Sequence, residues 1–217
     1  MLRALTLAAL AALALVASSC SPSNAPVRDP VDATLLRPKL PIIALADALE
    51  ALVARGADSH ADRKYAYQCV RSVPALSAED ALGHAIIAGR LAQISGLAAP
   101  SLVAEVERYA RQSAQLDPAL RAGAAERLLG TLYVNAPAAL LSHGDSEFGL
   151  ELLEGVAKRF PEHVPNRLRL AEGFVALGDP GPARVHLCFC VAHRAKLRPD
   201  EQKLLRDLLE QSHQQCP

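Results

Sequence analysis

A ten-residue segment in the last third of the chain has the spacing of a helix that ends at a turn: Leu170-Ala171-Glu172-Gly173-Phe174-Val175-Ala176-Leu177-Gly178-Asp179. Ala171 is small, the aromatic Phe174 follows three residues later, and a Gly-Asp pair supplies the turn. Beyond the turn, Ala183 and Leu187 are four residues apart, as on one face of a second helix. Small residues let two antiparallel helices approach closely, and the aromatic ring fills the space between them. The segment therefore predicts a helical hairpin.

The preceding segment repeats this spacing. Leu129-Gly130 supplies the small residue, Tyr133 supplies the aromatic ring, and Gly149 and Leu153 belong to the second helix. An insertion, residues 135–146, separates the two helices. Two successive units with the same order of small, aromatic and large apolar positions are typical of tetratricopeptide-like repeats. An unrelated Ala-rich helical bundle is the alternative.

Weaker units precede these two, and they predict helices over residues 40–55, 61–72, 80–95 and 101–116. A last helix is expected over residues 200–212. Proline can end one helix and start the next because it lacks an amide donor. We therefore expect an all-α, tetratricopeptide-like helical repeat of about four degenerate helix pairs, covered by the last helix. The prolines that close the units are Pro74, Pro118, Pro161 and Pro199.

The N-terminus has the three zones of a secretory signal. Arg3 gives a positive start, residues 4–17 are apolar apart from one threonine, and small residues precede Cys20. The segment 16–20 resembles the lipobox of bacterial lipoproteins, which implies cleavage after residue 19 and attachment of diacylglycerol and palmitate at Cys20. A cleaved signal without lipid and a retained anchor helix are the alternatives. Ser21 after the cysteine resembles an outer-membrane sorting signal, so we expect a location at the outer membrane, facing the periplasm.

The chain after the signal divides into a tether and one domain. Residues 20–40 are rich in proline and poor in apolar side chains that could form a core, so we expect a tether there. The helical-repeat domain is expected over residues 41–217, a length sufficient for one hydrophobic core.

Composition and motifs exclude several classes of function. Lys and Arg total 23 and Asp and Glu total 23, and this balance argues against a nucleic-acid surface. The sequence has no Gly-rich phosphate loop, no G-x-S-x-G elbow and no H-E-x-x-H motif. We therefore expect a protein that is not an enzyme and needs no cofactor.

The C-terminal half resembles one particular family of periplasmic proteins. The segments 129–137, 149–154 and 170–179, together with Pro161 and Asn166, are similar to the conserved stretches of the TRAP transporter T-component (TatT) family. The similarity covers about residues 120–195. It implies a periplasm-facing lipoprotein with a tetratricopeptide-like fold that partners the solute-binding protein of a TRAP uptake system.

Two hypotheses for the function follow from these patterns. The first is a lipid-anchored accessory binding component of a TRAP-type system, attached to the lipid bilayer, with self-association into a homo-oligomer left open. The second is a general protein–protein interaction scaffold that binds other envelope proteins during cell-envelope assembly, with no role in transport.

Binding in a helical-repeat protein is expected on the surface that the first helices of the pairs share. Arg127 and Asn166 are the preferred polar contacts for a ligand or peptide. Their alternatives are a helix cap for Asn166 after Pro165, and a solvated side chain for Arg127. The full set of candidates for this surface is Arg127, Thr131, Val134, Asn135, Pro137, Asn166, Leu168 and Glu172.

Cysteine and histidine spacing raises two further expectations. After lipidation four cysteines remain, which allow three full pairings in an oxidising compartment. We expect Cys216, which follows the last helix, to pair with Cys188 or Cys190, while Cys69 lies far away in a simple stack. His186, Cys190 and His193 share one helix face and could begin a zinc site, although helix packing is the favoured reading of these positions.

Overall fold

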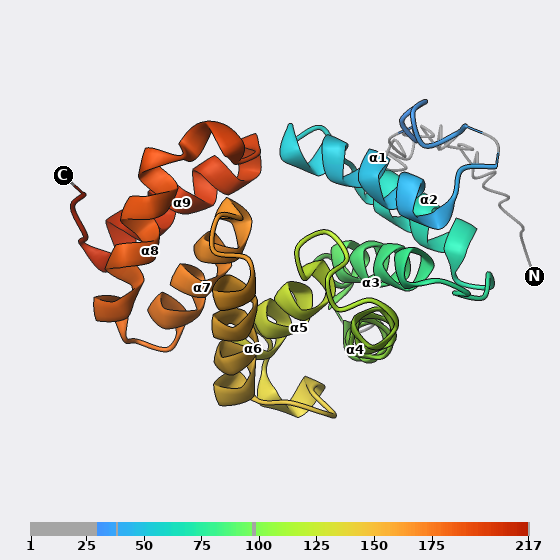
Figure 1. The fold of residues 1–217 in the computed structure, drawn as a ribbon. Helices are drawn as coiled ribbons and strands as arrows, with labels where there is room; N and C mark the ends of the chain where they lie inside the picture. Colours follow the sequence, from blue (N-terminus) through green and yellow to red (C-terminus); the bar gives the residue numbers. More distant parts are fainter. Residues whose placement is uncertain (1–29, 38, 97–98, 217) are drawn as a thin grey trace, which may run out of the picture.

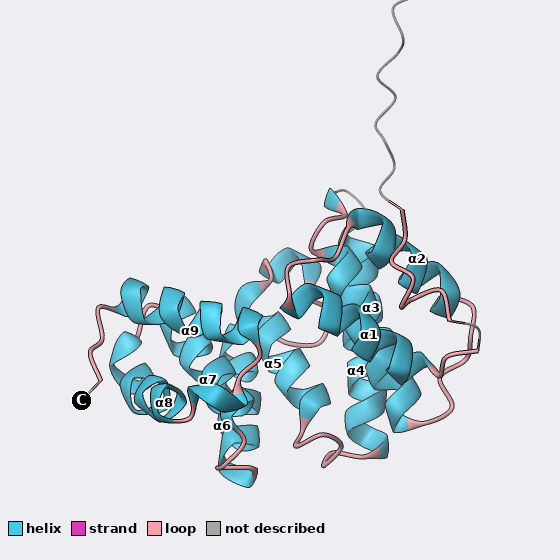
Figure 2. Cartoon of the chain, turned by 90° about the horizontal axis from the view of Figure 1, so that it is seen from above, coloured by secondary structure: helices cyan, strands magenta, loops and turns pink. Residues whose placement is uncertain are grey.

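The computed structural model describes residues 30–37, 39–96 and 99–216 (Figure 1). The signal segment, Cys20 and the tether before residue 30 lie outside the described residues. Within the described residues the chain forms α-helices and short 3-10 turns joined by loops, with no strand (Figure 2). The prediction of an all-α fold is therefore confirmed. None of the described helices has the length and apolar character needed to cross a bilayer.

Nine α-helices occur in this part of the chain, and they fall into four consecutive pairs followed by a last helix. The boundaries differ from the expected ones by a few residues at most, except that the first unit begins slightly later. The helices are α1 Ile42–Ala54, α2 His60–Val70, α3 Ala78–Ala92, α4 Ala99–Leu116, α5 Ala124–Asn135, α6 Ser146–Arg159, α7 Val164–Ala176, α8 Pro180–Ala192 and α9 Pro199–Ser212.

The order of helix contacts has a repeating form. Each second helix packs against the first helix of its own pair and against the first helix of the next pair, as in α5–α6 and α6–α7. The first helices α1, α3, α5, α7 and α9 also contact one another in that order, and α1 contacts α9. Figure 1 shows the resulting arc, with α1 and α9 brought close to each other. We call these five helices the first-helix ring.

Local sequence explains where these helices begin. Ser59 accepts a hydrogen bond from the backbone N–H of Asp62, and the Asp62 carboxylate accepts one from the Ser59 backbone N–H, which forms a capping box at α2. Ser77 and Asp145 cap α3 and α6 in the same way through one side-chain bond each. Pro199 is the first residue of α9, where a missing amide donor is harmless.

The close helix approach predicted from small residues occurs between α5 and α6. A Cβ atom added at Gly130 would lie 2.7 Å from Cγ of Leu153 and 2.8 Å from the carbonyl oxygen of Gly149. A Cβ atom added at Gly149 would lie 2.9 Å from the carbonyl oxygen of Gly130. Tyr133 is 1% exposed and fills the adjoining space. Two backbones therefore meet here at a distance that only glycine permits.

The folded domain begins earlier than the sequence indicated. Leu35, expected in the tether, is 1% exposed and belongs to the core formed with α1 and α2. The backbone N–H of Asp32 donates to Oδ1 of Asp62 over 2.7 Å. The expected boundary at residue 41 is thus too late, because an apolar side chain among the prolines completes the first core.

The insertion between α5 and α6 is held against the domain. Glu107 of α4 is buried, and its carboxylate accepts hydrogen bonds from the backbone N–H groups of Ser142 and His143 at 3.0 and 3.1 Å. Gly144 lies so close to the Tyr133 ring that an added Cβ atom would approach it to 2.5 Å. The insertion therefore packs onto α4 and α5 and adds no separate domain.

Candidate binding face on the first-helix ring

A network of charged side chains joins the first and last helices of the ring. Glu50 in α1 accepts hydrogen bonds from Nε and Nη2 of Arg90 in α3, at 2.5 and 2.8 Å. It also accepts one from Nη1 of Arg198, at the start of α9, at 2.7 Å. Burial raises the pKa of the Glu50 carboxyl, but the bonds and charges of the two arginines outweigh burial and hold it below its ordinary value. Glu50 is therefore ionised and binds both arginines.

The two polar residues preferred from the sequence lie in contact with each other. Nη1 of Arg127, in the first turns of α5, donates to Oδ1 of Asn166 at 2.6 Å. Nδ2 of Asn166 donates to the carbonyl oxygen of Ala122 at 3.0 Å, and Asn166 is only 1% exposed. The helix-cap alternative for Asn166 is wrong, because α7 begins after His163 and Asn166 lies inside its first turn. The solvated alternative for Arg127 is wrong as well, since the side chain is partly buried and bonded.

The neighbours of Arg127 are already paired elsewhere. Nη1 of Arg169 lies 2.7 Å from the carboxylate of Glu172, and Nη2 of Arg198 lies 2.9 Å from that of Asp200. Within the described residues, no carboxylate forms an ion pair with Arg127. Burial and the charges of Arg169 and Arg198, opposed by the charge of Glu201, lower the pKa of Arg127 to about 10.

A histidine lies at the same junction. His163 directly precedes α7, and its Nδ1 atom is buried without a hydrogen-bond partner in the described part of the chain. Burial and the charge of Arg127 lower the pKa of His163, so its ring is neutral at pH 7. Sequence reasoning missed this residue. Its place directly before the first helix of a pair was the one available signal.

We call the group of side chains around Arg127 and His163 the α5–α7–α9 junction. It combines residues at or near the starts of α5, α7 and α9, and two of its members, Arg127 and Asn166, were predicted. The others were missed; of these, Arg198 pairs with Glu50 of the first repeat, a contact that no local pattern indicates. The α5–α7–α9 junction consists of Arg127, His163, Asn166, Arg169, Arg198 and Glu201.

The remaining predicted candidates have mostly structural contacts. The Thr131 hydroxyl donates to the carbonyl oxygen of Arg127 at 2.8 Å, and Nδ2 of Asn135 donates to that of Thr131 at 2.9 Å. Val134 packs on the core between α6 and α7. Leu168 is 0% exposed and lies in the core of the last unit, so its expected position on the binding face is wrong. Pro137 is exposed in the insertion, and Glu172 pairs with Arg169 as described above.

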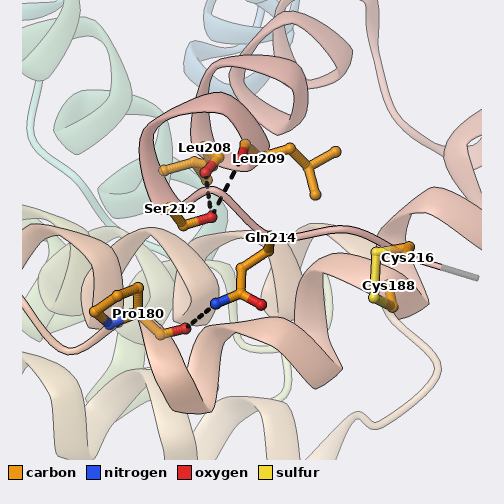
Figure 3. The surroundings of a disulfide bond; sticks show 7 residues. All are labelled: Pro180, Cys188, Leu208, Leu209, Ser212, Gln214 and Cys216. Atoms are coloured by element: carbon orange, nitrogen blue, oxygen red, sulfur yellow. Dashed lines mark hydrogen bonds between the residues drawn. A yellow bond between two sulfur atoms is a disulfide. The ribbon is translucent and has the colours of Figure 1, made fainter.

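The cysteine pairing resolves the alternatives left by the sequence. Cys188 of α8 forms a disulfide with Cys216, with the two Cα atoms 5.2 Å apart (Figure 3). Figure 3 also shows Gln214 of the same tail donating from Nε2 to the carbonyl oxygen of Pro180 at 3.5 Å. The tail after α9 is thus fixed back onto α8.

The other two cysteines among the described residues, Cys69 and Cys190, are free thiols. Cys69 is exposed on α2. Cys190 is buried in the last core, where its thiol donates to the carbonyl oxygen of Val164 at 3.7 Å. Burial raises the pKa of Cys190 to about 12, so it stays protonated and unreactive.

The zinc alternative is not supported. His186 stacks on Phe174 with ring centroids 6.1 Å apart, and Nδ1 of His193 contacts the carbonyl oxygen of Phe189 at 2.9 Å. Among the described residues, no three His, Cys, Asp or Glu side chains gather with the geometry of a metal site. The packing interpretation holds for Cys190, which is a core residue of the last unit.

No family model matches this sequence, and no curated protein matches it. Function therefore has to be inferred from the sequence patterns and from the geometry of the first-helix ring.

Proposed function

We propose that this protein is a lipid-anchored helical-repeat protein of the bacterial envelope and acts as the accessory binding component of a TRAP-type solute uptake system. The observation that carries the proposal is the first-helix ring, in which charged and amide side chains of the five helices bond to one another. The tetratricopeptide-like spacing around Gly130 and Ala171, and the resemblance of residues 120–195 to T-components, support the same role.

The ring is suited to binding because its side chains are held in place before a ligand arrives. Glu50 is bonded to Arg90 and Arg198, and the amide of Asn166 is oriented by the carbonyl group of Ala122. A surface whose polar groups are already ordered loses less conformational entropy when it binds. Helical repeats present such surfaces from a scaffold in which each unit supports its neighbours.

The proposed anchor would hold this surface near the membrane. Because the chain packs on α1 and α2 from about Val31, about ten residues separate Cys20 from the folded domain. Ten fully extended residues reach about 35 Å at most. The ring would therefore work close to the bilayer, where a membrane transport system also lies.

Metabolic labelling tests the anchor. Cells that express the full chain should incorporate labelled palmitate into it, and a Cys20→Ser variant should incorporate none. A Cys69→Ser variant is the matched control, because Cys69 is an exposed cysteine that we do not expect to carry lipid. Equal labelling of the Cys20→Ser variant would overturn the anchor.

Site-specific cross-linking tests the transport role. A photoreactive amino acid at position 169, on α7 of the ring, should capture a TRAP-type solute-binding protein in intact cells. The same group at position 184, an exposed position on α8 outside the ring, should not. Capture of envelope-assembly proteins in place of a solute-binding protein would overturn the transport role and favour the general scaffold.

A further inference from the structure

The outer side of α2 carries cations and no exposed acid. The only acid of this helix, Asp62, is buried with the residues that face α1 and α3. The exposed residues on the opposite side recur at spacings of four, four and three, so they form one stripe along the helix and its last turn. We call this set the α2 stripe, and it consists of His60, Lys64, Gln68 and Arg71. In the part of the chain that the structure describes, neither Lys64 nor Arg71 forms an ion pair.

The segment around the α2 stripe has an excess of positive charge. Residues 30–72 hold six Lys and Arg side chains against five Asp and Glu. Two of these acids, Asp47 and Glu50, pair with arginines outside the segment, which leaves three acids against the six cations. Of the three, Asp62 is buried, and Asp58 pairs with Arg63 at 2.5 Å. The charge that this segment shows to solvent is therefore mainly positive.

Two further acids lie near α2, and each has a cation close to it. Asp32, the third acid of the segment, is near enough to Arg55 for their charges to interact. Glu105 of α4 accepts a hydrogen bond from the Tyr67 hydroxyl at 2.8 Å, and exposed Arg108 follows it by three residues on the same helix. These acids do not cancel the charge of the α2 stripe.

An exposed apolar loop, residues 73–76, continues from the end of the stripe. Leu76 is 82% exposed, the largest exposure of a large apolar side chain among the described residues, and Val73 is 43% exposed. The loop backbone is nevertheless held in place. The carbonyl oxygen of Val73 lies 2.9 Å from Nε2 of His84, and that of Ala75 accepts a hydrogen bond from Nε2 of Gln112 at 3.0 Å. A fixed loop with outward apolar side chains is suited to contact with an apolar phase.

The described chain enters the domain beside α2. The backbone N–H of Asp32 donates to Oδ1 of Asp62, in the first turn of α2, at 2.7 Å. Figure 2 shows α2 at the outer edge of the domain, next to the start of the described chain. The proposed lipid at Cys20 is about ten residues away, so the start of α2 stays within about 35 Å of the bilayer. The helix is about 17 Å long, which brings the loop at its other end within reach as well.

We propose that the α2 stripe and the loop 73–76 dock on the anionic phospholipid headgroups of the bilayer that holds the anchor. This inference rests on the proposed function, in that it takes the chain to be anchored at Cys20, and it names the face that is turned toward the membrane. Lys64 and Arg71 lie among the phosphates, and Leu76 enters the boundary between headgroups and acyl chains. Glu79 and Asp80 follow the loop at the start of α3 and keep it at a shallow depth, because burying their charges is costly.

Docking through α2 gives the anchored domain one orientation. A lipid on a tether holds the domain near the bilayer but lets it turn. The α2 stripe is on the side of α2 that faces away from α1 and α3, its neighbours in the first-helix ring. With the stripe on the bilayer, those two ring helices are turned away from the membrane surface.

Full-length protein reconstituted into vesicles tests the docking. The vesicles consist either of phosphatidylcholine alone or of equal parts of phosphatidylcholine and the anionic lipid phosphatidylglycerol, and a headgroup carries an energy acceptor. A fluorescent donor on Cys69, an exposed thiol of α2, reports how close this helix is to the bilayer. Energy transfer should be higher in the anionic vesicles, and high salt should lower it to the value in phosphatidylcholine. A donor on Glu154→Cys, at an exposed position of α6 in a Cys69→Ser background, should show less transfer in the anionic vesicles.

Variants of the docking face should reduce this transfer. One Lys or Arg near an anionic surface contributes about fivefold to binding, so Lys64→Gln with Arg71→Gln should lower the ratio of docked to undocked protein about 25-fold. Leu76→Gln should lower transfer but keep its dependence on salt, because it removes only an apolar contact. All three positions are exposed, so the fold should be retained.

Matched substitutions on other helices are the controls. Arg184→Gln with Arg206→Gln removes two exposed arginines on α8 and α9, which changes the net charge by the same amount. Val185→Gln replaces another exposed apolar side chain, 64% exposed on α8. Both controls should show the same transfer from Cys69 as the unmodified protein.

Transfer that is higher in anionic vesicles, is lost in the stripe variant and is kept in the controls supports the inference. Equal transfer from Cys69 in both kinds of vesicle overturns it and leaves this face to an acidic protein partner. Equal effects of the stripe variant and of the arginine control also overturn it, because net charge alone would then explain the binding. Flotation separates this result from the anchor: a chain without an anchor does not float with phosphatidylcholine vesicles, whereas an anchored chain floats whether or not α2 docks.

Discussion

Nη1 of Arg198 lies 2.7 Å from Oε2 of Glu50, and the two residues are 148 positions apart in the sequence. Their bond joins the last helix of the stack to the first. Glu50 is also bound by Arg90, so one carboxylate connects three helices of the first-helix ring. The curved stack of helices is therefore closed by a specific contact between its first and last helices.

Removing the Glu50 charge should destabilise the protein by about 2 kcal/mol, because two neighbouring arginines would lose their common partner. This value is below the effect expected for a fully buried pair, since Arg198 is 37% exposed and partly screened by water. Urea unfolding of Glu50→Gln, Arg198→Gln and the double variant would give the coupling between the two side chains. We expect a coupling of about 1 kcal/mol.

An exposed pair on the same helix provides the control for this cycle. Lys203 and Asp207 of α9 lie 2.7 Å apart, but both side chains are more than half exposed. Lys203→Gln should change the free energy of unfolding by no more than about 0.5 kcal/mol. Equal effects of Glu50→Gln and Lys203→Gln on the free energy of unfolding would show that the Glu50 network stabilises the fold no more than an exposed ion pair does.

Acid should weaken the Glu50 network. The folded-state pKa of Glu50 is lower than the ordinary value of 4.5. The resulting stability is fully present above the ordinary value and is lost as pH falls through the lower folded-state pKa. The melting temperature of the unmodified protein should therefore fall more steeply below about pH 4.5 than that of Glu50→Gln. Parallel curves for the two proteins over this range would contradict the assignment.

Replacing glycine with alanine in α5 and α6 should have opposite effects on stability at contacting and at exposed positions. Gly130→Ala and Gly149→Ala would each push a methyl group into backbone of the facing helix, at 2.8 and 2.9 Å, and should destabilise by about 1 to 3 kcal/mol. Gly155→Ala, on the exposed side of α6 with nothing within 4 Å, should stabilise by up to about 1 kcal/mol. Urea unfolding of the three variants measures these effects. A stabilising Gly130→Ala would mean that the two helices are farther apart than described.

The helical fold could be predicted from sequence because its determinants are local. Small residues, aromatic residues and prolines recur at fixed spacings, and each pair forms from adjacent segments. Leu35 was missed because it lies in a proline-rich segment outside the repeat spacing, and its partners in α1 and α2 become visible only in the folded core.

The candidate site was predictable only in part. Arg127 and Asn166 could be selected one by one from their places on first helices, but their mutual bond could not. Leu168 was misplaced because a small error in counting around a helix moves a side chain from the surface to the core. The Glu50–Arg198 contact depends on curvature summed over every repeat, which no local pattern specifies.

Thiol chemistry should distinguish the four cysteines of the described domain. Iodoacetamide should modify exposed Cys69 in the native protein, and should reach buried Cys190 only after unfolding. Cys188 and Cys216 should react only after reduction, because they form a disulfide. Mass spectrometry of peptides gives each degree of modification. Native labelling of Cys216 without reductant would contradict the pairing.

Loss of the disulfide should lower stability without changing the fold of the ring. In the chain-entropy description a loop of this length is worth about 3 to 4 kcal/mol. Cys216→Ser removes the covalent link between the tail after α9 and α8, and thermal unfolding should show a lower melting temperature. Reductant should destabilise the unmodified protein to the same extent and leave Cys216→Ser unchanged.

Neighbouring leucines before α1 test where the folded domain begins. Leu35 is 1% exposed in the first core, whereas Leu36 is 51% exposed. Leu35→Ala should therefore destabilise the protein by about 2 to 5 kcal/mol, through lost burial and the cavity left behind. Leu36→Ala should stay within about 0.5 kcal/mol of the unmodified protein, as expected at an exposed position. Urea unfolding of the two variants compares identical substitutions one residue apart, so a difference must come from burial. Equal and small effects would return residues 31–37 to the tether, and the distance over which the proposed anchor can hold the ring would increase accordingly.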